Sequence, residues 1–402
     1  MFRRMRALAS NPVARASALR MVSLVVGILG SVTVARLGGA EVKGVASAFA
    51  AANAIGFMVV NFDLGQQVLR EARESGGPGR VLPTLSKAWV VYSVVGAIVL
   101  LVGLVWDMPV LWLAIGTLAF SIGTQAGVVT TGLVGVVVSA VGAIMQQLAL
   151  MAATLVLSAF DDLNTDTIRI AIVISYLAPL TIYLPFLVKA GGASKGGQLT
   201  PLWSLARKGS VWQVGRFFQM LLQKVDTIVV FTVLGAAAAG IYSVALSTAM
   251  LCTIMPAQFA NKTMFDATAG GRVRAARATR SALLSGGATA VGIASLGLLG
   301  LRVLYGPEFV AAYPSLLACL GGAIAYGVVQ VQTIVIRMLG TWKHLLLTSG
   351  VGLVVMGVSL LLLVSPWGAL GAGVSFSLGT TASALIGAVV GKRLEGRQTF
   401  QT

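Results

Sequence analysis

Long apolar runs, separated by short polar or basic segments, follow one another along the whole chain. Because about 20 apolar residues span the hydrocarbon core of a bilayer, each run predicts one membrane-spanning helix. The pattern therefore predicts an all-α polytopic membrane protein with twelve such helices. Their expected bounds are 18–37, 45–69, 86–106, 109–132, 136–159, 168–189, 209–234, 238–262, 281–304, 311–336, 344–364 and 368–391. The division between the fourth and fifth rests on the stretch TTGLVG alone.

Composition and charge agree with a membrane protein. The 402 residues are 57% hydrophobic and 10% charged, whereas soluble domains are about 25% charged. The formal net charge of +17 would suggest nucleic acid in a soluble protein. Membrane proteins instead collect Lys and Arg in their cytoplasmic loops, so we predict no nucleic-acid partner. The basic loops also predict cytoplasmic N- and C-termini and a multi-pass protein of the inner (plasma) membrane.

The chain divides near its middle. Residues 190–208 are glycine-rich and basic, and we predict a cytoplasmic linker there between an N-terminal six-helix bundle (1–189) and a C-terminal one (209–402). The segments 35–50 and 232–247 share a layout of Leu-Gly, a short turn, a glycine and a new helix. Pro109 and Pro307 open the fourth and tenth predicted helices at a similar offset. Two halves around a central cavity are a common transporter plan.

The predicted seventh helix carries polar groups inside its apolar run. Arg216, Gln219, Gln223 and Asp226 fall on one helical face, whereas Lys224 falls on another side. Ionisable groups in a bilayer cost several kcal/mol unless they face protein or water. The polar face is therefore expected to form one wall of a wet cavity.

Two interpretations stand for these side chains. Arg216, Gln219, Gln223 and Lys224 are candidate substrate-binding residues, because Arg donates bidentate hydrogen bonds to phosphate and Lys offers a point charge. The alternative for Arg216 is a side chain that reaches back to the inner interface. Asp226 is a candidate ion-coupling residue, for a proton or sodium, or a partner that neutralises a cation.

Other polar groups lie at the predicted helix ends or between helices. Asp63 is a candidate ion-coupling residue or inner gate, or else an interfacial residue that pairs with a nearby arginine. Arg36 and Glu41 are a candidate outer gate pair or interfacial anchors. Five glutamines are expected to bridge helices: Gln125, Gln146, Gln147, Gln330 and Gln332.

Enzyme signatures are missing from the sequence. The single histidine, His344, supports neither a catalytic triad nor a zinc cluster. Cys252 and Cys319 lie in apolar runs without metal-ligand spacing, and no GxxxxGK[ST] phosphate loop occurs. We therefore predict no enzyme activity, no catalytic residue, no metal site and no cofactor.

Several stretches resemble one transporter family. The segment ARLGGAEVKGVASAFAAANAIGFMVVNFDLGQQVLREA resembles the first hairpin of the polysaccharide exporter and O-antigen flippase family, and VDTIVVFTVLGAAAAGIYSVALSTAM resembles its second-half counterpart. LYGPEFVAAYPSL and SPWGALGAGVSFSL resemble two later elements of that family. The matching positions are Arg36, Gly38, Gly44, Asp63, Gly65, Asp226, Gly235, Gly240 and Tyr242.

That resemblance implies the multidrug, oligosaccharidyl-lipid and polysaccharide exporter superfamily. The implied activity is alternating-access transfer of a polyprenyl-diphosphate-linked oligosaccharide, a precursor of cell-surface polysaccharide, to the outer leaflet, driven by an ion gradient. The implied partners are this anionic glycolipid, membrane lipids, glycan polymerase and glycosyltransferases. Three alternatives stay open: a cation-coupled drug exporter of the same superfamily, a major-facilitator transporter, and a non-transporting membrane scaffold for glycan assembly.

Overall fold

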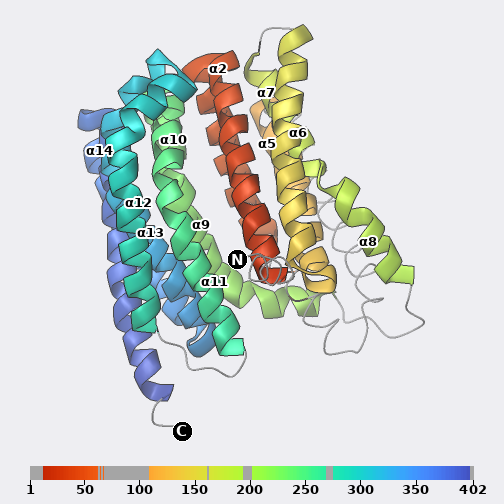
Figure 1. Ribbon diagram of the computed structural model, residues 1–402, viewed down its shortest axis with the longest axis vertical. Helices are drawn as coiled ribbons and strands as arrows, with labels where there is room; N and C mark the ends of the chain where they lie inside the picture. The colour runs from red at the N-terminus through yellow and green to blue at the C-terminus, as the bar shows by residue number, and fades with distance from the viewer. Residues whose placement is uncertain are drawn as a thin grey trace, which may run out of the picture. The chain divides into compact units, whose positions relative to one another are not determined.

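The computed structural model describes residues 12–61, 64, 67, 108–160, 163–192, 202–268 and 275–398 of the chain. Every regular element in these ranges is a helix, as the apolar runs predict. The elements are α2 (Pro12–Asn61), α5 (Met108–Val134), α6 (Val136–Phe160), α7 (Thr165–Leu177), α8 (Leu180–Gly192), α9 (Leu202–Leu234), α10 (Ala236–Ala249), η2 (Met250–Thr253), α11 (Ile254–Thr268), α12 (Ala275–Gly300), η3 (Leu301–Tyr305), η4 (Pro307–Ala312), α13 (Tyr313–Leu339) and α14 (Trp342–Gln398) (Figure 1). The predicted third span, 86–106, lies outside the described residues.

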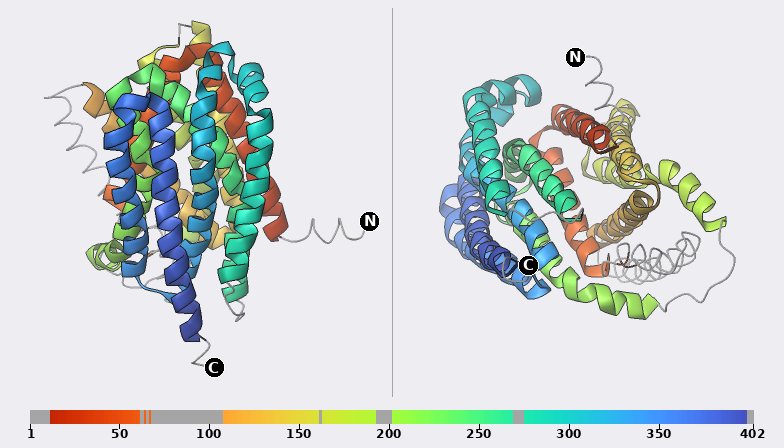
Figure 2. Two further views of the ribbon diagram at one scale, coloured as in Figure 1. Left: turned by 90° about the vertical axis from the view of Figure 1, so that its left-hand side faces the viewer. Right: turned by 60° about the horizontal axis from the view of Figure 1, so that its bottom comes forward.

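Glycines with a left-handed backbone divide the long helices. Within the described ranges, nine helical segments are long and apolar enough to cross a membrane, and two of them join consecutive α-helices, α7 with α8 and α10 with α11. Two others, α2 and α14, contain such a glycine, at Gly39 (φ 67°) and Gly368 (φ 57°). Each of these two therefore holds two of the predicted spans. The two arms of α14 lie side by side (Figure 2). The total of twelve spans stays a prediction.

Three further glycines with positive φ separate consecutive helices, namely Gly135, Gly235 and Gly306. Gly135 ends α5 and precedes α6, so the division predicted within TTGLVG is confirmed. Only glycine adopts this conformation without a steric penalty from Cβ, and this is why the breaks fall at these residues.

Proline breaks two spans that the apolar pattern predicts as continuous. The predicted sixth span, 168–189, is divided into α7 and α8 at Ala178 and Pro179. The predicted eighth span, 238–262, consists of α10, the 3₁₀ turn η2 and α11, whose third residue is Pro256. A proline removes one backbone hydrogen bond and its ring crowds the preceding turn. Hydropathy does not register this effect, because the residues on both sides stay apolar.

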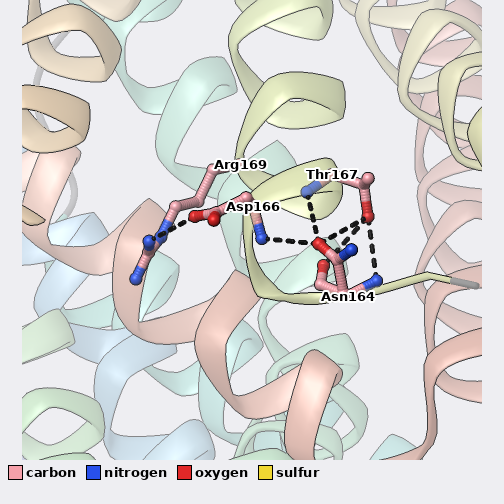
Figure 3. Close-up of polar contacts among 4 residues, drawn as sticks. All are labelled: Asn164, Asp166, Thr167 and Arg169. Atoms are coloured by element: carbon pink, nitrogen blue, oxygen red, sulfur yellow. Dashed lines mark hydrogen bonds and ion pairs between the residues drawn. The ribbon is translucent and has the colours of Figure 1, made fainter. Parts of the chain in front are cut away.

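The start of α7 is fixed by a local hydrogen-bond network (Figure 3). The Asn164 side chain accepts from the backbone N–H groups of Asp166 and Thr167, each at 3.0 Å, and Thr167 Oγ1 accepts from the Asn164 N–H at 2.9 Å. This capping box satisfies amides that the first helical turn leaves unpaired. Arg169 and Asp166 form an ion pair at 2.9 Å one turn further on. The helix therefore begins three residues before the predicted start.

Contacts divide the chain into two compact units. Unit 1 comprises Met1–Gly38 and Ala52–Gln213, and unit 2 comprises Gly39–Ala51 and Val214–Thr402. The predicted bundles 1–189 and 209–402 stay a prediction. The contact division differs from them by grouping residues 39–51 with unit 2 and residues 209–213 with unit 1. Helix α9 begins at Leu202, seven residues before its predicted start. Within unit 1, α5 contacts α6, α7 and α8.

Helix α13 is the centre of unit 2. It contacts α10, α11, α12 and α14, and most of its residues are buried. Small residues permit this packing: a Cβ on Gly322 would lie 2.6 Å from the Phe376 ring, and one on Gly373 would lie 3.0 Å from the Ser315 carbonyl oxygen. Close approach through small side chains is how helices associate where no water drives them together.

The repeated segment of each predicted half meets its counterpart inside unit 2. A Cβ added to Gly44 would overlap the carbonyl oxygen of Ala236, and one added to Gly240 would overlap the carbonyl oxygen of Ala40. Gly39 and Gly235, the two left-handed glycines, precede these contacts. All three pairs lie 196 residues apart, so the crossing is reciprocal. The first turn is therefore made by Gly39 and not by Gly38, the position that the family resemblance matched.

Alanine at either crossing glycine is expected to destabilise the protein. Its methyl group has no room, and inserting a methyl into a packed interface costs typically ~1–3 kcal/mol. We expect Gly44→Ala and Gly240→Ala each to lower the midpoint of thermal unfolding in detergent. The loss in the double variant should be smaller than the sum, because one alanine already separates the backbones.

Gly287→Ala is the matched control. Gly287 lies within α12, and a Cβ there meets nothing within 4 Å. Its alanine variant should retain or raise the midpoint, because alanine favours a helix over glycine by about 1 kcal/mol. Wild-type midpoints for both crossing variants would contradict the proposed tight contact.

Candidate functional site

The polar face of α9 lies partly against α13. Gln219 Nε2 donates to Thr333 Oγ1 at 3.1 Å, and Gln223 Nε2 donates to the Tyr326 hydroxyl. Residues one turn apart on α9 thus meet residues two turns apart on the antiparallel α13. The two hydrogen bonds fix the register of α9 relative to α13. They also give both glutamines a bonding partner within the protein. Their assignment to a substrate stays a prediction.

Asp226 is completely buried between α9 and α10. Its Oδ2 accepts a hydrogen bond from the Tyr242 hydroxyl at 2.6 Å, and its Oδ1 accepts from the Thr227 backbone N–H at 2.7 Å. Asp226 and Tyr242 both have 0% of their surface exposed. Hydrogen bonds to a carboxylate in a low-dielectric interior are strong, so this pair ties α9 to α10. The family resemblance matched both residues but gave no contact between them.

Cys319 extends this buried group from α13. Its thiol interacts with the Tyr242 hydroxyl, and it too is fully buried. Lys224 interacts electrostatically with Asp226, but at a separation beyond the 4.0 Å of an ion pair. This distance agrees with the helical geometry, which puts Lys224 on a different side of α9.

Arg216 and Lys224 differ from Asp226 in exposure. Both cationic residues are partly exposed, whereas the carboxylate is buried and accepts hydrogen bonds through both oxygens. Arg216 and Lys224 are therefore more accessible on this part of α9 than Asp226 is. The polar face predicted from the sequence thus comprises two amides bonded to α13, one buried acid and one partly exposed cation, Arg216; the second cation, Lys224, lies on another side of α9.

The remaining predicted residues lie elsewhere. Arg36 and Glu41 are exposed on either side of Gly39, and they belong to unit 1 and unit 2 respectively. Asp63 lies outside the described residues. Its neighbour Asn61 is buried and accepts from Gln125 Nε2 at 2.6 Å within unit 1.

Among the polar residues of α13, Tyr326 and Thr333 were not predicted as part of a site, whereas Gln330 was predicted to bridge helices. Tyr326, Gln330 and Thr333 follow helical spacing and share a face, and Gln330 interacts with the Tyr326 hydroxyl. That spacing is the signal that could have identified the face. Gln332 lies on a different face and donates to Thr279 Oγ1 on α12 at 2.7 Å, so it bridges helices as expected.

Among the described residues, no group of three or more His, Cys, Asp or Glu side chains could hold a metal ion. Cys252 and Cys319 are both buried as free thiols. The described part of unit 2 thus carries hydroxyl, amide, carboxylate and cationic groups beside these two thiols.

No protein-family model matches the sequence, and no curated protein aligns with it. Solved structures resemble the whole fold at low sequence identity. A lipid II flippase MurJ in an inward closed conformation has a TM-score of 0.70 and 13% identity, over 94% of this chain and 87% of that chain. A point mutant of the MATE transporter VcmN of Vibrio cholerae has a TM-score of 0.64 and 12% identity, over 96% of this chain and 97% of that chain.

A third structure is an outward-facing multidrug resistance MATE family transporter of the MOP superfamily. It has a TM-score of 0.67 and 13% identity, over 98% of both chains. At these identities the similarity establishes the fold. The chain thus has the helical architecture that these MATE transporters share with MurJ.

Proposed function

We propose that this protein is a membrane transporter that flips a polyprenyl-diphosphate-linked oligosaccharide to the outer leaflet by alternating access. The observation that carries the proposal is the pair of partly exposed cations, Arg216 and Lys224, on a membrane-spanning part of α9. The similarity of the fold to a lipid flippase and to MATE transporters supports a transport role.

The energetics of α9 favour an anionic cargo. An arginine or lysine at the centre of a spanning helix costs about 2.5–3.5 kcal/mol in insertion measurements. A diphosphate can offset this cost, because guanidinium donates to phosphate bidentately and lysine adds a point charge. A cation-coupled drug exporter would need an accessible acid for its cationic cargo. Asp226, the acid on this helix, is buried and bonded to Tyr242 and Thr227.

In this proposal, Asp226 and Asp63 respond to the coupling ion, and Arg36 and Glu41 form an outer gate. Both termini face the cytoplasm of a cell with an inner (plasma) membrane. Glycan polymerase and glycosyltransferases are the expected partners, because they would consume and supply the glycolipid.

Transport by purified protein in vesicles tests the proposal. A fluorescent polyprenyl-diphosphate sugar placed in one leaflet should become accessible to a quencher on the other side faster than in empty vesicles. The folded protein would be verified by its unfolding midpoint. Movement no faster than in empty vesicles would contradict the flippase assignment. Export of a cationic dye without glycolipid movement would favour the drug exporter, and neither activity would favour the scaffold.

Removing the cations should slow glycolipid movement. A hydrogen bond to a charged group contributes ~1.5–3 kcal/mol, so Arg216→Ala and Lys224→Ala should each reduce the rate about tenfold to a hundredfold. Arg216→Lys should restore only part of the rate, because lysine does not donate bidentately. The control is Arg277→Ala, which removes an exposed cation near the start of α12. Equal rates for all four variants would contradict the cation assignment.

Neutralising Asp226 should make the rate of glycolipid movement independent of the ion gradient. We expect Asp226→Asn to keep the fold, because the amide oxygen can still accept from Tyr242 or Thr227. Its glycolipid movement should no longer accelerate when a proton or sodium gradient is applied. Wild-type acceleration in this variant would contradict the coupling role of Asp226.

A further inference from the structure

Polar groups on α9 and α13 form a ladder inside unit 2 that leads to Asp226. We define the polar ladder as Gln219, Gln223 and Asp226 of α9 with Tyr326, Gln330 and Thr333 of α13. Two rungs are direct hydrogen bonds, from Gln219 to Thr333 and from Gln223 to Tyr326. Gln223 and Asp226 are three residues apart and therefore neighbours on the helix surface. The ladder joins the carboxylate to the end of unit 2 where α13 finishes.

The ladder contains hydrogen-bonding capacity that the described protein does not use. The Oε1 atom of Gln330 is buried and has no hydrogen-bonding partner among the described residues. The Tyr326 hydroxyl accepts from Gln223 and also interacts with Gln330, so it connects the glutamines of the two helices. A buried acceptor of this kind ordinarily holds a water molecule that bonds to several polar groups. The face of α13 is therefore suited to hold water beside the two glutamines of α9.

The ladder extends to one end only. Beyond Thr227, α9 reads Ile-Val-Val-Phe-Thr-Val-Leu, and the hydroxyl of Thr232 bonds to carbonyl groups of its own helix. Tyr242 and Cys319, on the far side of Asp226, are fully buried. Toward the end of α13, Asp226 thus has a series of polar side chains. Toward Gly235 its polar neighbours are the buried Tyr242 and Cys319, and α9 itself is apolar there apart from Thr232.

We propose that the polar ladder is a one-sided proton path between Asp226 and the aqueous side at which α13 ends and α14 begins. A proton enters from that side, passes along water molecules and the Tyr326 hydroxyl, and forms an O–H bond on the Asp226 carboxylate. The carboxylate becomes a neutral carboxyl group, and Tyr242 keeps its own proton. This inference rests on the proposed coupling role of Asp226 and deepens it by naming the ion and its route.

The charged and titratable groups around this path favour a proton over a metal cation. Lys224 on α9, Tyr242 on α10 and Cys319 on α13 interact with Asp226, and none of them is an anionic ligand that would complete a metal site. Arg216 lies ten residues along α9 toward the mouth of the ladder, about 15 Å away at 1.5 Å per residue. A proton moves by exchange along hydrogen bonds and needs no set of anionic ligands.

The test follows Asp226 itself, without glycolipid. Full-length protein is inserted in one orientation into vesicles, which protease access to the C-terminus verifies. The infrared band of the protonated Asp226 carboxyl is identified by its loss in Asp226→Asn. After a sudden change of pH on one side, we expect the band to change faster when the change is made on the side that carries the C-terminus, where α14 ends.

Variants of the ladder should slow this response. Gln330→Met and Tyr326→Phe should each lower the rate about tenfold, a barrier increase of ~1.4 kcal/mol. Gln332→Met is the matched control, because Gln332 is two residues away on another face of α13 and bonds to α12. Its rate should equal that of the wild type. Tyr326→Phe removes one oxygen atom and tests the path even where a glutamine variant fails to fold.

Three results would overturn the proposal: equal rates in all variants, equal rates from both sides, or no titrating band that depends on Asp226. These results are separate from those of the transport assay. Loss of glycolipid movement with a normal, one-sided titration would contradict the flippase function alone. Normal movement with an unaltered titration in the ladder variants would contradict the proton path alone.

Discussion

A polar side chain inside a bilayer must find its hydrogen-bonding partner within the protein, because lipid offers none. This constraint organises unit 2. Buried hydroxyls on α14 such as Ser375 and Thr380 donate to carbonyl groups one turn earlier, so their hydrogen-bonding partners lie within their own helix. Asp226 and Gln223 instead bond to Tyr242 and Tyr326 on other helices. Each such bond sets the rotation of α9 relative to a neighbour, so the polar residues determine which faces of the helices meet.

Glycine has a different role in unit 2: because it has no Cβ, it allows two backbones to approach closely. At Gly44 and Gly240 the carbonyl oxygens of Ala236 and Ala40 occupy the space that a Cβ would need. The reciprocal arrangement arises because the two segments are repeats of each other. A left-handed glycine before each segment turns the chain, and a second glycine five residues later allows the contact. The five-residue spacing of the two glycines therefore places the close contact between the segments about one helical turn after the turn of the chain.

The helical fold could be predicted from the sequence because apolar runs of spanning length admit few other structures. Gly135 and Gly235 end helices where the pattern places an end. The interruptions at Pro179 and Pro256 were not predicted, since proline changes hydrogen bonding without changing hydropathy. The face shared by Arg216, Gln219, Gln223 and Asp226 follows from helical periodicity alone. Periodicity gives no partner helix, so the bonds to Thr333, Tyr326 and Tyr242 required three-dimensional packing.

The arrangement on α9 also bears on how an ion and an anionic cargo would influence each other. Lys224 interacts electrostatically with Asp226 and keeps partly exposed surface. An anion bound at Lys224 would offset the positive charge that favours ionised Asp226, and so would promote proton binding there. Linkage requires the reverse as well: protonation of Asp226 removes a negative charge near Lys224 and strengthens anion binding by the same factor. Within the proposed function, proton and glycolipid would therefore favour each other's binding without sharing a ligand, and Lys224 would be the residue through which they communicate.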